Sequence, residues 1–446
     1  MKNNLLQSVL FLVLLVPSIS KSQTIIADTV TMNQGYSNSV YFNIRTGKKT
    51  LSPTNAWDMS HTTVSRDNCL RINHMNGIEL YAYPNGDNSA YTSMDTSGWT
   101  KWKKYYNSIS VHDLGAFNQS VNKKNMWDFS WGVYDPTTKI ITGDSLYLLV
   151  INNPSKGKTF LKFMPIAQLI SGDFIFKFGS LDGTNNRTDT LMQSDFTGKS
   201  YKYYNFLKGK IQVEPLRDNY DILFTRYLAL SVPPGGGSPV FYPTMGVESK
   251  RGTRISKITD YTWTEIGQNP AKVLDAIKTP GNQIQLSNDL TKIGSDWKTY
   301  NNASMLWKIE NTWIYIVESV RNQVIPNDTA YWMISFTGFS GSGKGDTYFN
   351  RQELKGRVSA SSKTNKLRAT LFPNPAEKEL LLWISSESQC ANIKLLGTDG
   401  RVISSLNAIS LSDSSLRIPI EQLASGSYRI LVQTPTEQIN LPFFKQ

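Results

Sequence analysis

The chain of 446 residues contains few cysteines, few histidines and few charges. Its two cysteines, Cys69 and Cys390, are widely separated, which excludes a disulfide framework and a cysteine-rich metal site. The three histidines, His61, His74 and His112, all fall near the start of the chain, so histidine-dependent chemistry confined to a later domain is excluded. Charged residues make up only 18%, too few for charge-driven disorder or a solenoid of charged helices. The fold must therefore be stabilised by the packing of apolar side chains.

Long apolar runs are also scarce. The run at residues 9–16 is much shorter than the roughly 20 residues that a membrane-spanning helix needs. A basic residue precedes the run, and residues 20–22 follow it with the small-x-small pattern of a cleavage site. Residues 1–22 are therefore predicted to be a signal peptide, and the mature chain, from Gln23, is expected to leave the cytoplasm.

The formal net charge is +12, but the lysines and arginines are scattered mostly one at a time. This distribution is typical of a solvated basic surface, so we expect no nucleic-acid partner. Aromatic residues make up 11% of the chain, and short stretches alternate apolar with polar side chains before ending at Gly, Pro, Asn or Asp. The alternation predicts antiparallel strands with one buried face.

The chain between residues 23 and 351 repeats itself. Matched segments keep their order, and the distance between partners grows from 162 to 173 residues. A distance that grows only between landmarks is what loop insertions produce in a duplicated β-domain. We therefore predict an all-β fold with two tandem antiparallel domains, at 23–190 and 191–351, and a short helix at 270–277. The matched segments are 42–48 with 204–210, 57–59 with 220–222, 146–149 with 314–317 and 172–176 with 345–349.

Residues 371–446 differ from the rest of the chain. They are rich in leucine, isoleucine and serine, and short strand patterns alternate with turn signals, which predicts a small C-terminal β-sandwich. The preceding segment, 352–370, places charged residues among serines and threonines without apolar periodicity. It is predicted to be a linker.

Three landmarks give this C-terminal module a family resemblance: F-P-N-P-A at 372–376, Gly400-Arg401 after an I-x-L strand, and L-x-x-G-x-Y at 423–428. The module resembles the C-terminal sorting domain of the type IX secretion system. The resemblance implies export through the periplasm, with the type IX machinery as a partner, to the cell surface or the extracellular space. Attachment to the outer-membrane surface and release from the cell both stay open.

The order of motifs within each copy resembles the HmuY-like haem-binding family of Gram-negative bacteria. The shared features are an aromatic-x-apolar-x-x-Gly-Lys segment, a Trp-Asp-apolar segment, a ribbon at 70–77 and a late pair of aromatic strands. The resemblance implies a haem held between loops by two axial side chains, histidine or methionine. Haem is therefore the expected cofactor, with a haem-carrying host protein as a further expected partner.

The expected haem site is altered in this sequence. A family segment similar to W-x-x-F-S-H-G reads W-D-F-S-W-G here, so Trp131 stands where the imidazole would be. Because an indole nitrogen does not ligate iron, Met94 and His112 are the candidate iron ligands of the first copy. Met245 and Met305 are the candidates of the second copy. A methionine beside aromatic residues is also a common core residue, and that interpretation stays open for each.

Trp99 and Trp102 stand close to Lys101, Lys103 and Lys104, and could stack on haem, a sugar or another planar ligand. The same residues could equally form a half-buried strand followed by solvent-facing lysines. The sequence contains no nucleophile elbow, no H-E-x-x-H motif and no spaced Cys/His cluster. We therefore expect a binding protein and not an enzyme, with haem acquisition as one function and surface adhesion through glycan or protein contacts as the alternative.

Overall fold

The described residues form two compact units. The larger unit holds those between residues 24 and 355, and the smaller unit those between 367 and 446. The predicted signal peptide lies outside the described residues, as do residues 356–366 of the predicted linker. The computed structural model describes residues 24–64, 68–155, 157–233, 236–279, 284–321, 328–355, 367–385, 390–397, 399–410, 415–434 and 438–446.

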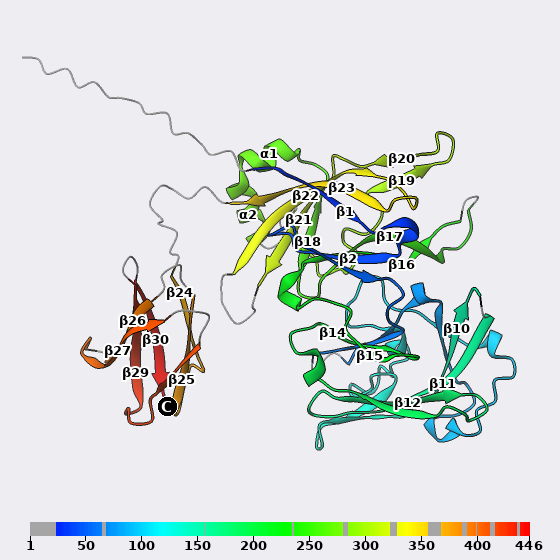
Figure 1. Ribbon diagram of the computed structural model, residues 1–446, viewed down its shortest axis with the longest axis horizontal. Coiled ribbons are helices and arrows are strands. Elements are labelled where there is room, and N and C mark those ends of the chain that lie inside the picture. Colours follow the sequence, from blue (N-terminus) through cyan, green and yellow to red (C-terminus); the bar gives the residue numbers. More distant parts are fainter. Residues whose placement is uncertain are drawn as a thin grey trace, which may run out of the picture. The chain divides into compact units, whose positions relative to one another are not determined.

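Strands are the main regular structure of the larger unit (Figure 1), which confirms the predicted all-β fold. Two short helices, α1 (Trp263–Gln268) and α2 (Pro270–Lys278), follow one another, and α2 confirms the helix predicted at 270–277. Among the described residues, neither helix has the length and apolar character needed to cross a bilayer. The strands are Ile26–Thr31 (β1), Asn38–Phe42 (β2), Lys49–Pro53 (β3), Met59–Thr62 (β4), Leu70–Ile72 (β5), Ile78–Ala82 (β6), Lys104–Tyr105 (β7), Gly132–Asp135 (β8), Ile140–Gly143 (β9), Tyr147–Asn153 (β10), Gly157–Gln168 (β11), Phe174–Ser180 (β12), Arg187–Leu191 (β13), Tyr201–Asn205 (β14), Gly209–Ile211 (β15), Ile222–Ser231 (β16), Val240–Ser249 (β17), Arg254–Ile258 (β18), Lys298–Asn301 (β19), Leu306–Ile309 (β20), Ile314–Val320 (β21), Thr329–Phe339 (β22) and Asp346–Leu354 (β23).

Strand β12 illustrates why these segments form strands. Phe174, Phe176 and Phe178 are buried, whereas the residues between them are only partly buried. Every second side chain of a strand faces the same side, so this spacing directs all three rings into one core. The rings are stacked, with centroids 5.6 Å apart for the first two and 6.0 Å apart for the last two.

The strands of the larger unit form four main sheets and pair as antiparallel neighbours. The strand orders are β1-β23-β22-β21-β18, β13-β12-β11-β10-β6-β7 with β8 and β9 attached, β15-β14-β4-β5, and β17-β16-β2-β3; β19 and β20 form a separate hairpin.

The described residues of this unit form two large apolar cores and two smaller clusters. The first contains buried residues from 59 to 206, and the second combines residues 30–44 with residues 222–349. The N-terminal strands therefore pack with the second core, and the segment after residue 190 begins by packing with the first. The cores are not divided at residues 190 and 191, where the sequence predicts the domain boundary, because strands are exchanged between the copies.

The exchange involves the first hairpin of each copy. Hairpin β2–β3 pairs with β16 of the second copy and places Phe42 opposite Ile222. Hairpin β14–β15 pairs with β4 of the first copy and places Tyr204 opposite Met59. The preceding strands follow the same rule, because β1 pairs with β23 (Figure 1) and β13, the strand before β14, pairs with β12. Segments matched in the sequence thus occupy matching places in the sheets, each in the other copy's core.

A buried aspartate fixes each exchanged hairpin. The Asp58 carboxylate accepts a hydrogen bond of 2.7 Å from the backbone N–H of Phe206, at the turn of the second copy's hairpin. The Asp221 carboxylate accepts one of 2.8 Å from the N–H of Ile44, at the turn of the first copy's hairpin. Asp58 also accepts from the Asn76 side chain at 2.5 Å. A buried N–H must find an acceptor, so each aspartate satisfies a donor that the exchange brings inside.

Arginine side chains reinforce the exchange in the second copy. Arg321 forms a bidentate pair with Asp221, with nitrogen–oxygen distances of 2.7 and 2.5 Å. Buried Arg351 donates to Asp28 of β1 at 2.5 Å and to the carbonyl of Ile44 at 2.8 Å. Bidentate and charge-assisted bonds of this kind are the strongest hydrogen bonds in proteins. They hold the N-terminal strands on the second core.

The smaller unit is the predicted C-terminal module. Its two sheets, β24-β25-β28 and β27-β26-β29-β30, enclose one apolar core of leucine, isoleucine, valine, alanine and phenylalanine side chains. The strands are Arg368–Phe372 (β24), Glu379–Ser385 (β25), Cys390–Leu396 (β26), Val402–Ser410 (β27), Ser415–Pro419 (β28), Gly426–Gln433 (β29) and Gln438–Lys445 (β30).

We predict unequal losses of stability when the two aspartates are removed. Asp221→Ala leaves Arg321 without its partner and should lower the free energy of unfolding by about 3–5 kcal/mol. Asp58→Ala leaves only neutral donors unsatisfied and should cost about 1–3 kcal/mol. Urea unfolding followed by tryptophan fluorescence measures both. The exposed Asp260→Ala is the control and should change stability by less than about 0.5 kcal/mol; losses no larger than this control would contradict the proposed role.

Candidate functional site

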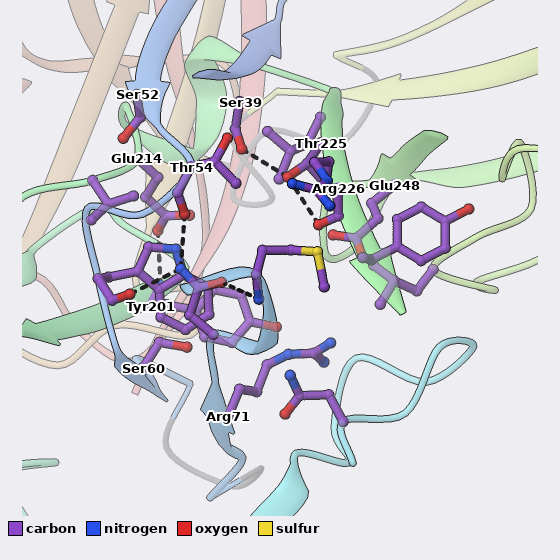
Figure 2. Close-up of a pocket in the computed structure, with 18 of the residues that line it drawn as sticks. Ser39, Ser52, Thr54, Ser60, Arg71, Tyr201, Glu214, Thr225, Arg226 and Glu248 are labelled. Carbon is purple, nitrogen blue, oxygen red and sulfur yellow. Dashed lines mark hydrogen bonds between the residues drawn. The ribbon is translucent and has the colours of Figure 1, made fainter. Parts of the chain in front are cut away.

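A cavity of about 130 Å³ lies between the two sheets that contain the exchanged hairpins. Both copies line it, so the site belongs to the larger unit as a whole (Figure 2). The side chains labelled in Figure 2 come from β2 (Ser39), β3 (Ser52), β4 (Ser60), β5 (Arg71), β14 (Tyr201), β16 (Thr225 and Arg226) and β17 (Glu248), with Thr54 after β3 and Glu214 after β15.

Charges of both signs line this cavity: Arg71, Arg226, Lys250 and Arg251 are cationic, and Glu214 and Glu248 are carboxyl groups. Arg71 donates long hydrogen bonds to the carbonyls of Ser108, at 3.3 Å, and His112, at 3.4 Å, and also bonds to the thiol of Cys69. Burial raises the pKa of Glu248, and the nearby charge of Arg71 opposes part of that rise. Among the described residues, neither Arg71 nor Glu248 takes part in an ion pair. Both charged groups therefore have bonding capacity left for a ligand.

Glu214 is a second carboxyl at the junction, but its oxygens are occupied. It accepts hydrogen bonds from the backbone N–H groups of Ser200 and Tyr201, the latter at 2.8 Å, and from the hydroxyl of Tyr220 at 3.0 Å. Burial raises its pKa, while these hydrogen bonds oppose the rise. Glu214 therefore connects the start of β14 to Tyr220, and its role is structural.

The loop at 107–114 closes one side of the junction. Asp113 forms an ion pair with Arg251 of the second copy, and His112 Nε2 lies 3.4 Å from the hydroxyl of Ser249. Burial, together with the positive charges of Arg71 and Arg251, lowers the pKa of His112 to about 3. The ring is therefore neutral at physiological pH and bridges the two copies.

The aromatic cluster predicted from the sequence lies elsewhere. Met94, Trp99 and Trp102 are partly buried and pack against Leu148 and Val150. In strand β10 these two residues alternate with residues of the first core, so the cluster lies on the opposite face of that sheet. The alternative of a half-buried strand is right about the burial of these tryptophans but not about the strand, because Trp99 begins a 3-10 helix, Trp99–Lys101, and Trp102 follows it.

The other haem candidates lie in separate places. Trp131 is fully buried in the first core, and its Nε1 donates to the carbonyl of Asn68 at 3.0 Å. Met245 is buried in the second core, whereas Met305 is 76% exposed in the turn between β19 and β20. His112 lies at the junction and Met94 on the outer face of a sheet, so the structure does not bring the two predicted iron ligands together. The described part of the chain also contains no group of three or more His, Cys, Asp or Glu residues placed to hold a metal ion.

Of the site residues predicted from the sequence, His112 alone lines the cavity. Arg71 lies within the predicted ribbon at 70–77, but a single arginine there is most simply a solvated side chain. Tyr201 and Glu248 belong to no motif. Alignment of the two copies strand by strand, rather than motif by motif, is the signal that would have placed Arg71 and Glu248 together.

Comparison with known proteins identifies the C-terminal module. Residues 370–443 match the secretion system C-terminal sorting domain, here of the type IX system. The match confirms the predicted localisation. The protein is exported to the cell surface or the extracellular space, and its C-terminal module interacts with the type IX machinery.

No curated protein matches the chain. Among solved structures, the chain is similar to that of dimeric latent PorU from Porphyromonas gingivalis, with 11% identity and a TM-score of 0.17. The alignment covers 84% of this chain and 34% of that one, and likeness at this level carries no argument about fold or function. The HmuY-like resemblance of residues 23–351 is not supported by these comparisons and stays a prediction.

We predict that His112 makes the protein less stable in acid. The unfolded chain protonates this ring as the pH falls below its ordinary pKa of 6.5, whereas the folded chain does so only near pH 3. Stability is therefore lost between these values, at up to about 1.4 kcal/mol per pH unit for one proton. His112→Gln should remove that part of the slope in urea unfolding measured from about pH 6 to about pH 4.

Ser249→Ala is the matched control, because it removes the same hydrogen bond but keeps the titrating ring. It should retain the wild-type slope. Equal slopes for the wild type and His112→Gln would show that the ring titrates alike in the folded and unfolded chains.

Proposed function

We propose that this protein is a binding protein of the cell surface or extracellular space, and that its two copies together hold one small polar ligand at the junction. The observation that carries the proposal is the lining of the cavity, where hydroxyl, guanidinium and carboxyl groups of both copies converge. A few convergent polar groups in a concave site are typical of ligand recognition. Export places the site where molecules from the surroundings reach it.

The size of the cavity supports a small ligand better than haem. A protein cavity of about 150 Å³ accommodates benzene, and the junction cavity measures about 130 Å³. A porphyrin is several times larger than benzene. The separation of Met94 from His112 also disfavours axial ligation by that pair. Haem acquisition thus stays a prediction that the experiment below tests directly.

The chemistry of the site supports binding rather than catalysis. The nearest arrangement of a nucleophile and a base is Ser249 beside His112, at 3.4 Å. A ring whose pKa is lowered to about 3 is a poor general base at neutral pH. Glu214 is already saturated with hydrogen bonds and cannot orient a reacting group.

Surface adhesion is a second candidate function. The far part of hairpin β16–β17 exposes four large apolar side chains: Leu230, Val232, Val240 and Tyr242 are between 48% and 62% exposed. Exposed apolar patches of this kind often mark contacts with other proteins. This hairpin supports a protein-binding role that is independent of the junction cavity.

Thermal unfolding of the full chain tests the cavity function. Each probe is added alone: a monosaccharide, a free amino acid, a short-chain carboxylate and haemin. A ligand present at 100 times its Kd stabilises the fold by about 2.7 kcal/mol, so at least one polar probe should raise the Tm by a few degrees. Haemin should give no saturable shift of its Soret band.

Ser60→Leu provides the matched control. Leu223 occupies the equivalent position of the second copy and also lines the cavity, so the strand register accommodates leucine there. The variant should fold, fill part of the cavity and lose the Tm shift. A shift that persists in Ser60→Leu would place the ligand elsewhere, and a saturable low-spin haem spectrum would favour haem acquisition instead.

A further inference from the structure

Arg71 and Glu248, two of the charged residues that line the cavity, occupy equivalent positions in the two copies. Ser60 of β4 and Leu223 of β16 are 163 residues apart, which is also the spacing of the two buried aspartates. In the pairing of β4 with β5, Ser60 stands opposite Arg71. In the pairing of β16 with β17, Leu223 stands opposite Glu248. The duplication has therefore placed an arginine and a glutamate at the same point of the same strand pair.

Equivalent positions of the two exchanged sheets face one cavity. Arg71 and Glu248 both line it, and each is close enough to influence the charge state of the other. They form no ion pair with each other among the described residues. The first copy's strand pair thus contributes Arg71 to the cavity and the second copy's contributes Glu248. The second copy also contributes Arg226, Lys250 and Arg251; Lys250 donates to backbone carbonyls and Arg251 pairs with Asp113.

We propose that the junction cavity binds a small zwitterion of the amino-acid type. Its carboxylate is held by the Arg71 guanidinium and its ammonium group by the Glu248 carboxylate. The proposal rests on the proposed binding function and names the ligand class. Two copies with identical residues at these positions would offer like charges. Arg71 and Glu248 instead offer opposite charges, which match the carboxylate and the ammonium group of a ligand with two charged ends.

The remaining lining supports this class. The cavity of about 130 Å³ limits the ligand to a small side chain. Ser39 and Thr225 already bond to each other at 2.7 Å, and Glu214 is saturated with hydrogen bonds. The charged groups with bonding capacity left are Arg71, Glu248 and Arg226, and they decide the orientation of a ligand. Among the described residues neither Arg71 nor Glu248 has an ion-pair partner, and a zwitterion offers a counter-charge to both at once.

Isothermal titration calorimetry of the full chain tests the proposal with three matched probes. L-alanine carries both charges, propionate lacks the ammonium group, and ethylamine lacks the carboxylate. Alanine should bind at least about tenfold more tightly than either partial probe, because each partial probe leaves one cavity charge unpaired. Equal binding of alanine and propionate would overturn the proposal. Binding of a neutral sugar without alanine would also overturn it, yet would leave the cavity function standing.

Substitutions of Arg71 and Glu248 test which residue binds which charged group of the ligand. Glu248→Gln should weaken alanine at least about tenfold and bring it level with propionate, whereas Arg71→Gln should bring it level with ethylamine. A purely structural role would not produce this crossed selectivity. Arg401→Gln, an exposed substitution in the smaller unit, is the matched control and should leave alanine binding unchanged.

The double reversal, Arg71→Glu with Glu248→Arg, separates recognition from folding. Because the positions are equivalent, the reversed cavity should bind alanine in the opposite orientation, within a few-fold of the wild type. Thermal unfolding identifies variants that fold. A folded double variant that has lost alanine binding, or folded single variants that bind all three probes like the wild type, would show that the two charges serve only to hold the copies together.

Discussion

The hydrogen bonds from the turn of each hairpin to the buried aspartate of the other copy are the constraint on which the larger unit depends. Asp58 receives the N–H of Phe206, and Asp221 receives the N–H of Ile44. These contacts join segments that are far apart in the sequence. They are possible only because the first hairpin of each copy pairs with a strand of the other copy. The two cores are therefore halves of one unit and depend on each other for completion.

The exchange also creates the site. The two sheets that receive the hairpins face each other across the junction, so a cavity lined by both copies follows from the topology. Equivalent positions of the two strand pairs then hold residues of opposite charge, Arg71 in the first copy and Glu248 in the second. The smaller unit determines the location of the protein, since its sorting domain directs export to the cell surface or the extracellular space.

Much of this architecture could be predicted from the sequence, but the exchange and the site could not. The aspartates align through their aromatic and apolar neighbours, yet a hairpin buries the same side chains whichever copy it pairs with, so no pattern shows the exchange. The family resemblance places Trp131 at the position of an iron ligand, whereas its ring is buried in the first core and donates to the carbonyl of Asn68. The cavity combines residues of both copies, and a search for motifs within one copy cannot find it.

The exchange is the central claim, and a disulfide test addresses it most directly. Ala27 of β1 stands opposite Asn350 of the second copy, whereas without exchange its partner would be Lys177 of the first copy, which stands opposite Thr188 in the equivalent pairing. Cysteines at 27 and 350 should form a disulfide on mild oxidation, seen by mass spectrometry, and cysteines at 27 and 177 should not. The reverse result would show that each copy keeps its own strands and would contradict the account.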